Sequence, residues 1–450
     1  MKVGEMMNDD IIAAIATSRL EAAISIIRLS GKDCIAFVQD IFTGKILNKE
    51  SHTITYGYII DNNKKIDEVL VNIYRGKKTF TGEEMVEINC HGGVFITQKI
   101  LQLCLNKGAR MAERGEFSKR AFLNGRIDLS QAEAITDLIS AKNDYSVSLA
   151  LRGIQGNISD FIKDLKEDLI QIITQIEVNI DYPEYDDVEE LTAMSLLPKS
   201  ETLLKKMNKI INESKNVHLM KDGISTVIVG KPNVGKSSLL NALLQENKAI
   251  VTDIAGTTRD IVEGSIRIDN IILNMIDTAG IRSTDDIIEK MGVEKSKELI
   301  YKADLVLLVI DGSKELEKED QELLDITKDT NRIVIVNKKD EGKVIDIEGI
   351  NISAKENDIE LLIEKIKEMF ELGYIVSSDE ELVTNARQLQ LLEKANQSLD
   401  IAINEMREGI TTDLIVTDLY DAWENLREIL GEQAKEDLLD ELFKRFCIGK

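Results

Sequence analysis

The sequence predicts a multidomain α/β protein with an N-terminal α+β domain, a discontinuous helical domain, and an inserted α/β domain that has a doubly wound, mostly parallel sheet. Short β-branched runs mix with helical stretches in the first quarter of the chain. Apolar residues then recur at intervals of three and four, and this spacing returns at the C-terminal end. Between the two helical stretches, strand and helix patterns alternate from about Gly223 to Leu372, as in a parallel sheet with crossover helices.

These patterns divide the 450 residues into four ranges. The α+β domain occupies 1–125, the inserted domain occupies 221–373, and the helical domain consists of 126–220 and 374–450. About three domains are usual for a chain of this length. We expect the two helical halves to pack together, and the alternative is two separate small bundles.

Composition narrows the class of protein. The formal net charge of −24 predicts that the molecule as a whole repels nucleic acid and anionic membranes, so any RNA contact has to be local. Four widely spaced cysteines without a C-x-x-C pair argue against a zinc site or a disulfide framework and favour a reducing compartment. The longest aliphatic run, Leu305 to Ile310, is too short to span a bilayer. We therefore expect a soluble cytoplasmic protein that does not bind membranes.

In the first domain, the runs Ile24–Leu29, His52–Ile60 and Val69–Tyr74 have strand composition. The polar turn between the second and third runs predicts a β-hairpin. A helix is expected from Phe95 to Asn106.

In the helical domain, apolar spacing from Ile154 to Ile180 predicts one long amphipathic helix that ends at Asp181, before Pro183. A second helix is expected from Leu197 to Ser214. The C-terminal half has the same spacing at Leu419, Trp423, Leu426, Leu430, Leu438, Leu439, Leu442 and Phe446.

The stretch 230–237 reads G-K-P-N-V-G-K-S, which matches the phosphate-binding loop G-x-x-x-x-G-K-S. A β-branched run precedes it and a helical composition follows it, as the motif requires. Its glycines let backbone amides face a phosphate chain, its lysine reaches the terminal phosphates, and its serine hydroxyl ligates Mg²⁺. The residues expected at the nucleotide are Asn233, Val234, Gly235, Lys236, Ser237 and Ser238.

Three later stretches predict that the nucleotide is GTP and that the domain is a Ras-like P-loop GTPase. D-T-A-G at 277–280 follows a strand, so its aspartate can hold Mg²⁺ and its glycine can sense the γ-phosphate. N-K-K-D at 337–340 follows another strand, and its carboxylate can accept the two N–H donors of guanine, which adenine lacks. S-A-K at 353–355 can close over the base. The residues are Asp277, Thr278, Ala279, Gly280, Asn337, Lys338, Asp340, Ser353, Ala354 and Lys355.

The switch stretch A-G-T-T-R-D at 255–260 contains Thr258, which can ligate Mg²⁺ when GTP is bound. Ile281 stands where small regulatory GTPases place a water-orienting glutamine, so another catalytic device is needed. One candidate is K⁺ bound by Asn233 and by backbone carbonyls of Thr252 to Thr257. The other is Glu289, which could position water, and the alternative for Glu289 is a solvated helix carboxylate.

Three further stretches carry a family resemblance: I-I-R-L-S-G at 26–31, G-E-F-S-K-R-A-F-L-N-G-R-I-D-L at 115–129, and the terminal F-C-I-G-K. With them, the chain resembles the tRNA-modification GTPases of the MnmE (TrmE) type. The resemblance implies an N-terminal domain that dimerises and binds 5-formyl-tetrahydrofolate or a related folate. The implied folate-site residues are Arg28, Glu87, Arg126 and Lys450.

Some of these folate-site assignments have alternatives. Glu83 and Glu84 lie close to Glu87 in the sequence. Taken alone, Arg28 is also explained as a strand arginine that extends from an apolar run, and Arg126 as a solvated cation at the start of a helix.

The resemblance also assigns the metals and the chemistry. It implies a K⁺ site formed by Asn233, Thr252, Ile254 and Thr257, Mg²⁺ bound by Ser237 and Thr258, and catalysis supported by Glu289. A flavin-dependent MnmG-type partner would form a heterotetramer with the homodimer and, together with it, attach a carboxymethylaminomethyl or aminomethyl group to carbon 5 of the wobble uridine of certain tRNAs. Cys447 matches a residue that could act in this chemistry, and the alternative is a buried apolar cysteine.

Two local features complete the expectations. Thr17–Ala23 lacks the glycine-containing turn usual in the family, which affects the expected loop geometry and folate pocket. Six basic residues between Lys107 and Arg126 are a candidate contact for RNA or for a folate anion, namely Lys107, Arg110, Arg114, Lys119, Arg120 and Arg126.

The main rival function is a GTP-dependent assembly or signalling switch that binds a ribosomal or protein partner. A membrane-associated GTPase is the third, and no basic amphipathic helix supports it.

Overall fold

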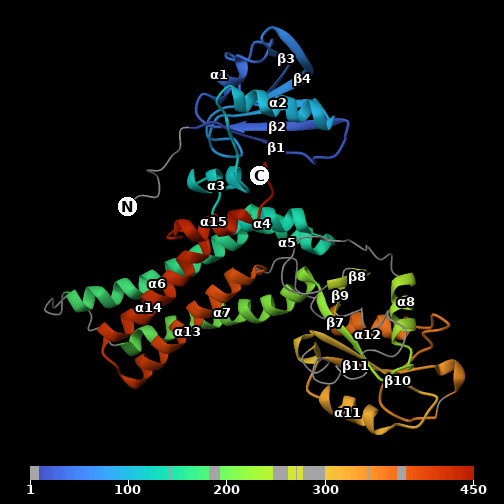
Figure 1. Cartoon of the computed structure of the whole chain (residues 1–450). Coiled ribbons are helices and arrows are strands. Elements are labelled where there is room, and N and C mark those ends of the chain that lie inside the picture. The colour runs from blue at the N-terminus through green and yellow to red at the C-terminus, as the bar shows by residue number, and fades with distance from the viewer. Residues whose placement is uncertain are drawn as a thin grey trace. The chain divides into compact units, whose positions relative to one another are not determined.

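The computed structural model describes residues 10–141, 143–181, 193–246, 262–269, 271–276, 299–342, 344–371 and 382–450. Contacts divide the chain into two compact units (Figure 1). The first unit comprises Met1–Ser140, Ala150–Leu203 and Lys394–Lys450, and the second comprises Ala141–Leu149 and Leu204–Glu393.

The first unit contains a six-stranded sheet in the order β3-β4-β5-β2-β1-β6. Neighbouring strands are antiparallel except β1 and β6. The strands are β1 Ile12–Ile15, β2 Ile24–Ser30, β3 Thr53–Asp61, β4 Lys64–Tyr74, β5 Met85–His91 and β6 Arg110–Met111. The predicted hairpin is confirmed as β3 and β4, and Asn62 and Asn63 at its turn have positive φ angles of 46° and 64°.

One face of this sheet is covered by α1 (Cys34–Gln39) and α2 (Val94–Asn106), and the second of these confirms the predicted helix. Residues at alternating strand positions, among them Ile27, Leu29 and Ile88, are buried with both helices in one apolar core. The intervening positions, including Arg28 and Glu87, therefore belong to the opposite face. That face carries the second of the two sites described below.

Helices form the rest of the first unit. The helix predicted from Ile154 to Ile180 is wrong at its start, because Gly156 has a φ of 95° and separates α5 (Asp144–Gln155) from α6 (Asn157–Asp181). Asp181 is the last described residue of α6, and the predicted helix end before Pro183 lies outside the described residues. The remaining helices are α3 Glu116–Leu123, α4 Leu129–Ser140, α7 Ala193–Asp222, α13 Ala386–Glu408, α14 Thr412–Leu430 and α15 Glu436–Lys444. Helices α5, α7 and α13 extend across the division between the units.

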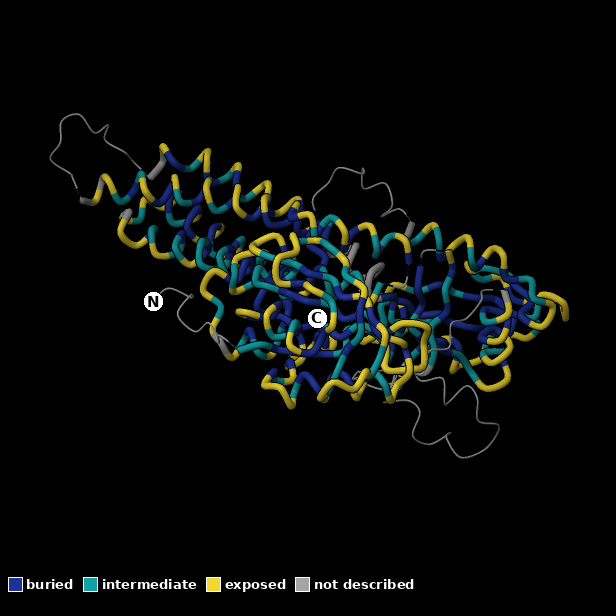
Figure 2. Tube along the Cα trace, turned by 90° about the horizontal axis from the view of Figure 1, so that it is seen from above, coloured by how far each residue is buried: buried dark blue, intermediate teal, exposed yellow. Residues whose placement is uncertain are grey.

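The two helical stretches pack on each other, as expected. Helices α6 and α14 lie in contact, and the Tyr420 hydroxyl donates a hydrogen bond to Glu177 Oε1 at 2.5 Å. Lys166 and Glu432 form an ion pair between the same two stretches. Figure 2 shows buried positions that alternate with exposed ones along these helices, as amphipathic packing requires. The alternative of two separate bundles is wrong.

The second unit contains a sheet in the order β12-β11-β10-β7-β9-β8. Its strands are β7 Ile224–Val229, β8 Val262–Ile268, β9 Ile271–Ile276, β10 Leu305–Asp311, β11 Arg332–Asn337 and β12 Ile350–Asn351. All neighbours are parallel except β8 and β9. Separate apolar cores lie on the two sheet faces, one with α8 (Lys236–Glu246) and α12 (Glu360–Glu371), the other with α11 (Lys318–Ile326). The predicted doubly wound, mostly parallel sheet is confirmed.

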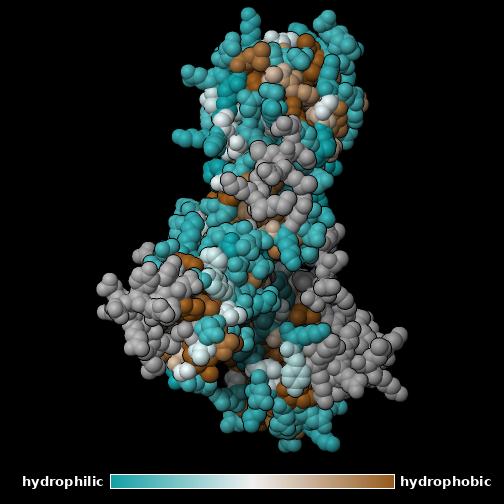
Figure 3. Space-filling model, turned by 90° about the vertical axis from the view of Figure 1, so that its left-hand side faces the viewer, coloured by the Kyte–Doolittle hydropathy of each residue, from teal (hydrophilic) through white to brown (hydrophobic). Residues whose placement is uncertain are grey.

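The predicted fold class is confirmed, whereas the domain boundaries stay predictions. No helix in the described part of the chain is long and apolar enough to cross a membrane. Figure 3 shows one face of the molecule, on which hydrophilic residues predominate and apolar residues are interspersed.

Candidate functional site

The phosphate-loop stretch connects the end of β7 to the start of α8, as predicted. Neither of its two glycines can be replaced by a residue with a side chain without a clash. Gly230 has a φ of 153°, and a Cβ there would lie 2.3 Å from the Val309 carbonyl oxygen. Gly235 has a φ of 101°, and its Cβ would lie 2.2 Å from Asn337 Nδ2. The loop therefore presents bare backbone, as a phosphate cradle requires.

Lys236 begins α8 and points back across this loop. Its Nζ donates hydrogen bonds to the Gly230 carbonyl at 2.8 Å and to the Lys231 carbonyl at 2.7 Å. Burial lowers the pKa of the Lys236 ammonium group. A cation held at the N-terminus of a helix by two loop carbonyls is suited to bind a phosphate chain. Ser237 and Ser238 lie on the first turn of α8.

Asn337, at the end of β11, joins this loop to the predicted base-recognition stretches. Its side chain is buried, its Nδ2 donates to the Val234 carbonyl at 2.8 Å, and its Oδ1 accepts from the Ala354 backbone N–H at 3.0 Å. The phosphate loop, N-K-K-D and S-A-K stretches therefore meet at one buried amide.

Asp340 lies exposed beside this junction and is available to a base. Ser353 Oγ donates to its Oδ1 at 2.6 Å, and this hydrogen bond lowers the pKa of the Asp340 carboxyl. The group is ionised at neutral pH and can accept N–H donors. Lys355 is exposed and acts electrostatically on the same carboxylate.

Asn233 has a φ of 63° and is exposed in the phosphate loop. The other predicted switch, catalytic and cation-site residues lie outside the described residues. They are Thr252, Ile254, Thr257, Thr258, Asp277, Thr278, Ala279, Gly280, Ile281 and Glu289.

A second polar site lies on the face of the first sheet opposite α1 and α2. Arg28 and Glu87 are register partners on β2 and β5 and form an ion pair, with Arg28 Nη2 2.8 Å from Glu87 Oε1. The Tyr74 hydroxyl donates to Glu87 Oε2 at 3.2 Å. The guanidinium carbon lies 5.2 Å from the ring centre of Phe80 and 5.7 Å from that of Phe117.

The C-terminal tail reaches this second site. Arg28 Nη1 donates to the Gly449 carbonyl at 3.0 Å. Burial, and then the neighbouring Arg28 cation, lowers the pKa of the Lys450 ammonium group. Of the predicted folate residues, the structure therefore brings Arg28, Glu87 and Lys450 together.

The structure also decides three alternatives that the sequence left open at this site, which concern Glu83, Glu84 and Cys447. No described hydrogen bond or ion pair joins Glu83 or Glu84 to Arg28. Glu83 accepts hydrogen bonds from Ser30 and Asn124, and Glu84 pairs with Arg75. Cys447 is exposed, so the alternative of a buried apolar cysteine is wrong.

Arg126 is exposed in the connection before α4, and no described hydrogen bond or ion pair joins it to Arg28 or Glu87. Its place in a folate site stays a prediction.

In the Thr17–Ala23 segment, Ser18 and Arg19 line a pocket of about 260 Å³ with residues of α2.

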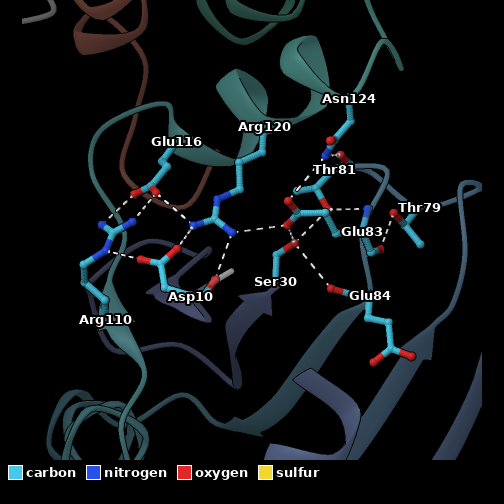
Figure 4. A network of polar contacts seen from close by, with 10 residues as sticks. All are labelled: Asp10, Ser30, Thr79, Thr81, Glu83, Glu84, Arg110, Glu116, Arg120 and Asn124. Atoms are coloured by element: carbon cyan, nitrogen blue, oxygen red, sulfur yellow. Dashed lines mark hydrogen bonds and ion pairs between the residues drawn. The ribbon is translucent and has the colours of Figure 1, made fainter. Parts of the chain in front are cut away.

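Helix α3 is fixed on the sheet by a network of charged residues, shown in Figure 4. Arg120 lies at its centre and is 8% exposed. It pairs with Asp10 at 2.6 Å, with Glu116 at 3.3 Å and with Glu83 at 3.3 Å, and Asn124 donates to the Thr81 carbonyl at 2.7 Å. Glu116, Arg120 and Asn124 are four residues apart, so one face of α3 docks while the adjacent Phe117 lies against Arg28.

The sequence offered the basic residues between Lys107 and Arg126 as a contact for an anion, but the structure pairs half of them with carboxylates. Arg110 pairs with Asp10 and Glu116, Arg120 pairs with three carboxylates, and Lys119 pairs with Asp440. These three cations are neutralised within the fold, which removes half of the positive charge that the sequence pattern offered to an anion.

Two family models match different parts of the chain. Residues 11–126 match the family model described as "GTP-binding protein TrmE N-terminus", and residues 129–447 match the model described as "MnmE helical domain". The chain is 48% identical over 98% of its length to the tRNA modification GTPase MnmE of Lactococcus lactis subsp. cremoris strain SK11, and covers 98% of that relative.

The chain belongs to the MnmE (TrmE) family of tRNA modification GTPases. The family resemblance inferred from the sequence is confirmed.

A second relative, tRNA modification GTPase MnmE of Streptococcus pneumoniae strain Hungary19A-6, is 48% identical over 98% of this chain and 99% of its own length. Among solved structures, a variant of Aquifex aeolicus Era bound to GDP·AlF4⁻ is 28% identical, covers 39% of this chain and 66% of that one, and superposes with a TM-score of 0.25.

Several residues of this MnmE-family chain were not predicted from the sequence. Tyr74, Phe80 and Phe117 surround the Arg28–Glu87 pair, and Asp311 pairs with Lys338. Phe117 belongs to the family-specific stretch, so that stretch could have indicated it. The others are ordinary strand and loop residues whose proximity depends on strand register.

We predict that Gly235→Ala weakens binding of GDP by at least about tenfold, since a Cβ at a φ of 101° is strained by about 1–3 kcal/mol and displaces Asn337. Fluorescence titration with a labelled GDP measures it. Gly264→Ala is the control, because its Cβ has nothing within 4 Å. Equal affinity of Gly235→Ala and the unmodified chain would contradict the role of Gly235.

Proposed function

We propose that this chain binds and hydrolyses GTP with Mg²⁺ and that it couples hydrolysis to modification of carbon 5 of the wobble uridine of certain tRNAs. The observation that carries the proposal is the buried Asn337 amide, which holds the phosphate loop at Val234 and the base-recognition stretch at Ala354. Ser237 and Thr258 would hold Mg²⁺, which would stabilise the negative charge that develops on the phosphates.

Guanine selection would come from Asp340. Its carboxylate is exposed, ionised and oriented by Ser353, so it would accept the N1–H and 2-amino donors of guanine. Adenine presents no such pair of donors. Lys236, held between two loop carbonyls, would turn to the terminal phosphates.

Asp340→Asn should change the preference from guanosine to xanthosine triphosphate, because the amide supplies a donor to the 2-oxo group of xanthine. Turnover of both nucleotides by the full-length variant, with Asp325→Asn on α11 as the exposed control, measures the change. Unchanged selectivity for GTP would refute the assignment of Asp340.

The proposal includes a K⁺ ion in place of a catalytic arginine or glutamine. Asn233 presents its amide from the exposed part of the phosphate loop. Carbonyls of Thr252, Ile254 and Thr257 would complete the ligand set, and Glu289 would assist by positioning water. A monovalent cation there would offset the charge that forms between the β- and γ-phosphates.

GTP turnover in K⁺ should exceed turnover in Na⁺ by about tenfold or more, and Asn233→Ala should remove the difference. Phosphate release at matched ionic strength measures both rates. Equal rates in the two salts for the unmodified chain would eliminate the K⁺ proposal and leave Glu289 as the candidate.

The Arg28–Glu87 site is proposed to bind 5-formyl-tetrahydrofolate or a related folate as one-carbon donor. The carboxylate of Glu87 is a suitable acceptor for the N–H groups of a pterin ring, while Phe80 and Phe117 offer aromatic surfaces. Lys450 and Arg126 would pair with the glutamate carboxylates of the ligand. Cys447, exposed three residues before the end of the tail, is the proposed reactive group nearby.

Glu87→Gln should weaken binding of 5-formyl-tetrahydrofolate by about tenfold or more, because a hydrogen bond to a charged acceptor is lost. Isothermal calorimetry on the full chain measures it. Glu84→Gln is a matched control, since Glu84 pairs instead with Arg75, 3.3 Å away. Equal folate affinity in Glu87→Gln and the unmodified chain would exclude Glu87 from the site.

The proposed assembly is a homodimer formed through the N-terminal domain, joined by a flavin-dependent MnmG-type protein into a heterotetramer that acts on tRNA. Ile54, Tyr56 and Leu70 are exposed on the face of the N-terminal sheet opposite α1 and α2 and would suit a protein interface. Light scattering of the chain alone and with an MnmG-type flavoprotein tests both associations; a monomer would contradict the dimer.

A further inference from the structure

Asp311 ends β10 directly opposite Asn337 of the N-K-K-D stretch. It is buried, and its Oδ2 accepts a hydrogen bond from Lys338 Nζ at 2.6 Å. Its Oδ1 accepts from the backbone N–H and the hydroxyl of Ser313, at 3.0 and 2.6 Å. Burial alone would raise the pKa of the Asp311 carboxyl, but these hydrogen bonds hold that pKa below its usual value.

The two turns are joined through their backbones as well. Gly312 N–H donates to the Asn337 carbonyl at 2.8 Å, and Val344 N–H donates to the Gly312 carbonyl at 2.8 Å. Lys338 has a left-handed φ of 67°, and from this turn its ammonium group reaches the Asp311 carboxylate. The side chains of Asp311 and Lys338 are only 8% and 22% exposed, so salt screens the pair weakly.

Asp340, the proposed guanine acceptor, lies two residues after Lys338 in the same tight turn. Lys338 and Lys355 both act electrostatically on its carboxylate. A lysine ammonium free to bond with Asp340 would compete with the N–H donors of guanine for the same oxygens. Asp311 removes that competitor by binding the Lys338 ammonium on the side of β10.

We propose that Asp311 is a positioning residue for guanine recognition, which holds the Lys338 ammonium away from Asp340 and thereby keeps that carboxylate available to the base. The inference rests on the proposed GTP function. Asp311 touches no part of the base in this scheme and acts only through Lys338.

The test compares GDP with inosine diphosphate, whose base lacks the 2-amino group and so offers Asp340 one donor fewer. Asp311→Asn should weaken GDP binding by about tenfold and bring the GDP and inosine diphosphate affinities closer together. A merely structural role would weaken both nucleotides equally. In a Lys338→Met background, Asp311→Asn should have no further effect on the ratio, because the competing ammonium is gone.

Controls separate the outcomes. Lys314→Met removes an exposed lysine 3.9 Å from the same carboxylate and should leave both affinities unchanged. If Asp311→Asn does not fold, Asp311→Glu retains the charge and should show a smaller loss in the same direction. Failure of the unmodified chain to bind GDP would refute the proposed function itself, whereas binding with an unchanged GDP to inosine diphosphate ratio in the Asp311 variants would overturn this inference alone.

Discussion

The nucleotide site depends on one buried side-chain amide, that of Asn337. It is a donor to the Val234 carbonyl in the phosphate loop and an acceptor from the Ala354 backbone N–H beyond β12. Leaving either buried partner unpaired would cost about 1–3 kcal/mol. Gly235 must be glycine because the amide occupies the space a Cβ would need. The hydrogen bonds of the Asn337 amide therefore fix the position of the phosphate loop relative to the stretches that recognise the base.

The Arg28–Glu87 site depends on the docking of α3 against the first sheet. Arg120 is nearly buried and satisfies three carboxylates, which holds α3 against the sheet and places Phe117 beside Arg28. The tail then adds the Gly449 carbonyl and Lys450. The family-specific stretch 115–129 thus has a mainly structural task, which explains why several of its charged residues are paired inside the fold and are not offered to an anion.

Local patterns in the sequence were sufficient for the fold class, the hairpin, the parallel sheet and the loop between β7 and α8. They failed where a single glycine, Gly156, breaks a helix whose apolar spacing continues. Local patterns alone also could not reveal pairings between distant positions. Arg28 contacts Glu87 59 residues away and Gly449 421 residues away, and only the family resemblance placed Arg28, Glu87 and Lys450 in one site. Such contacts follow from strand register and helix docking, for which one sequence gives no direct signal. Asp311 was missed for this reason, because only the parallel register of β10 and β11 brings it to Lys338.

We propose that nucleotide binding at the Asn337-centred site drives modification of tRNA. The test is mass spectrometry of wobble uridines in cells from which the gene has been deleted. These cells carry either no replacement gene, the unmodified gene, or the gene for Gly235→Ala. We expect carbon 5 modification to be absent without the chain, restored by the unmodified gene, and not restored by a Gly235→Ala protein present at equal level. Normal modification in cells without the chain, or full restoration by Gly235→Ala that fails to bind GDP, would contradict it.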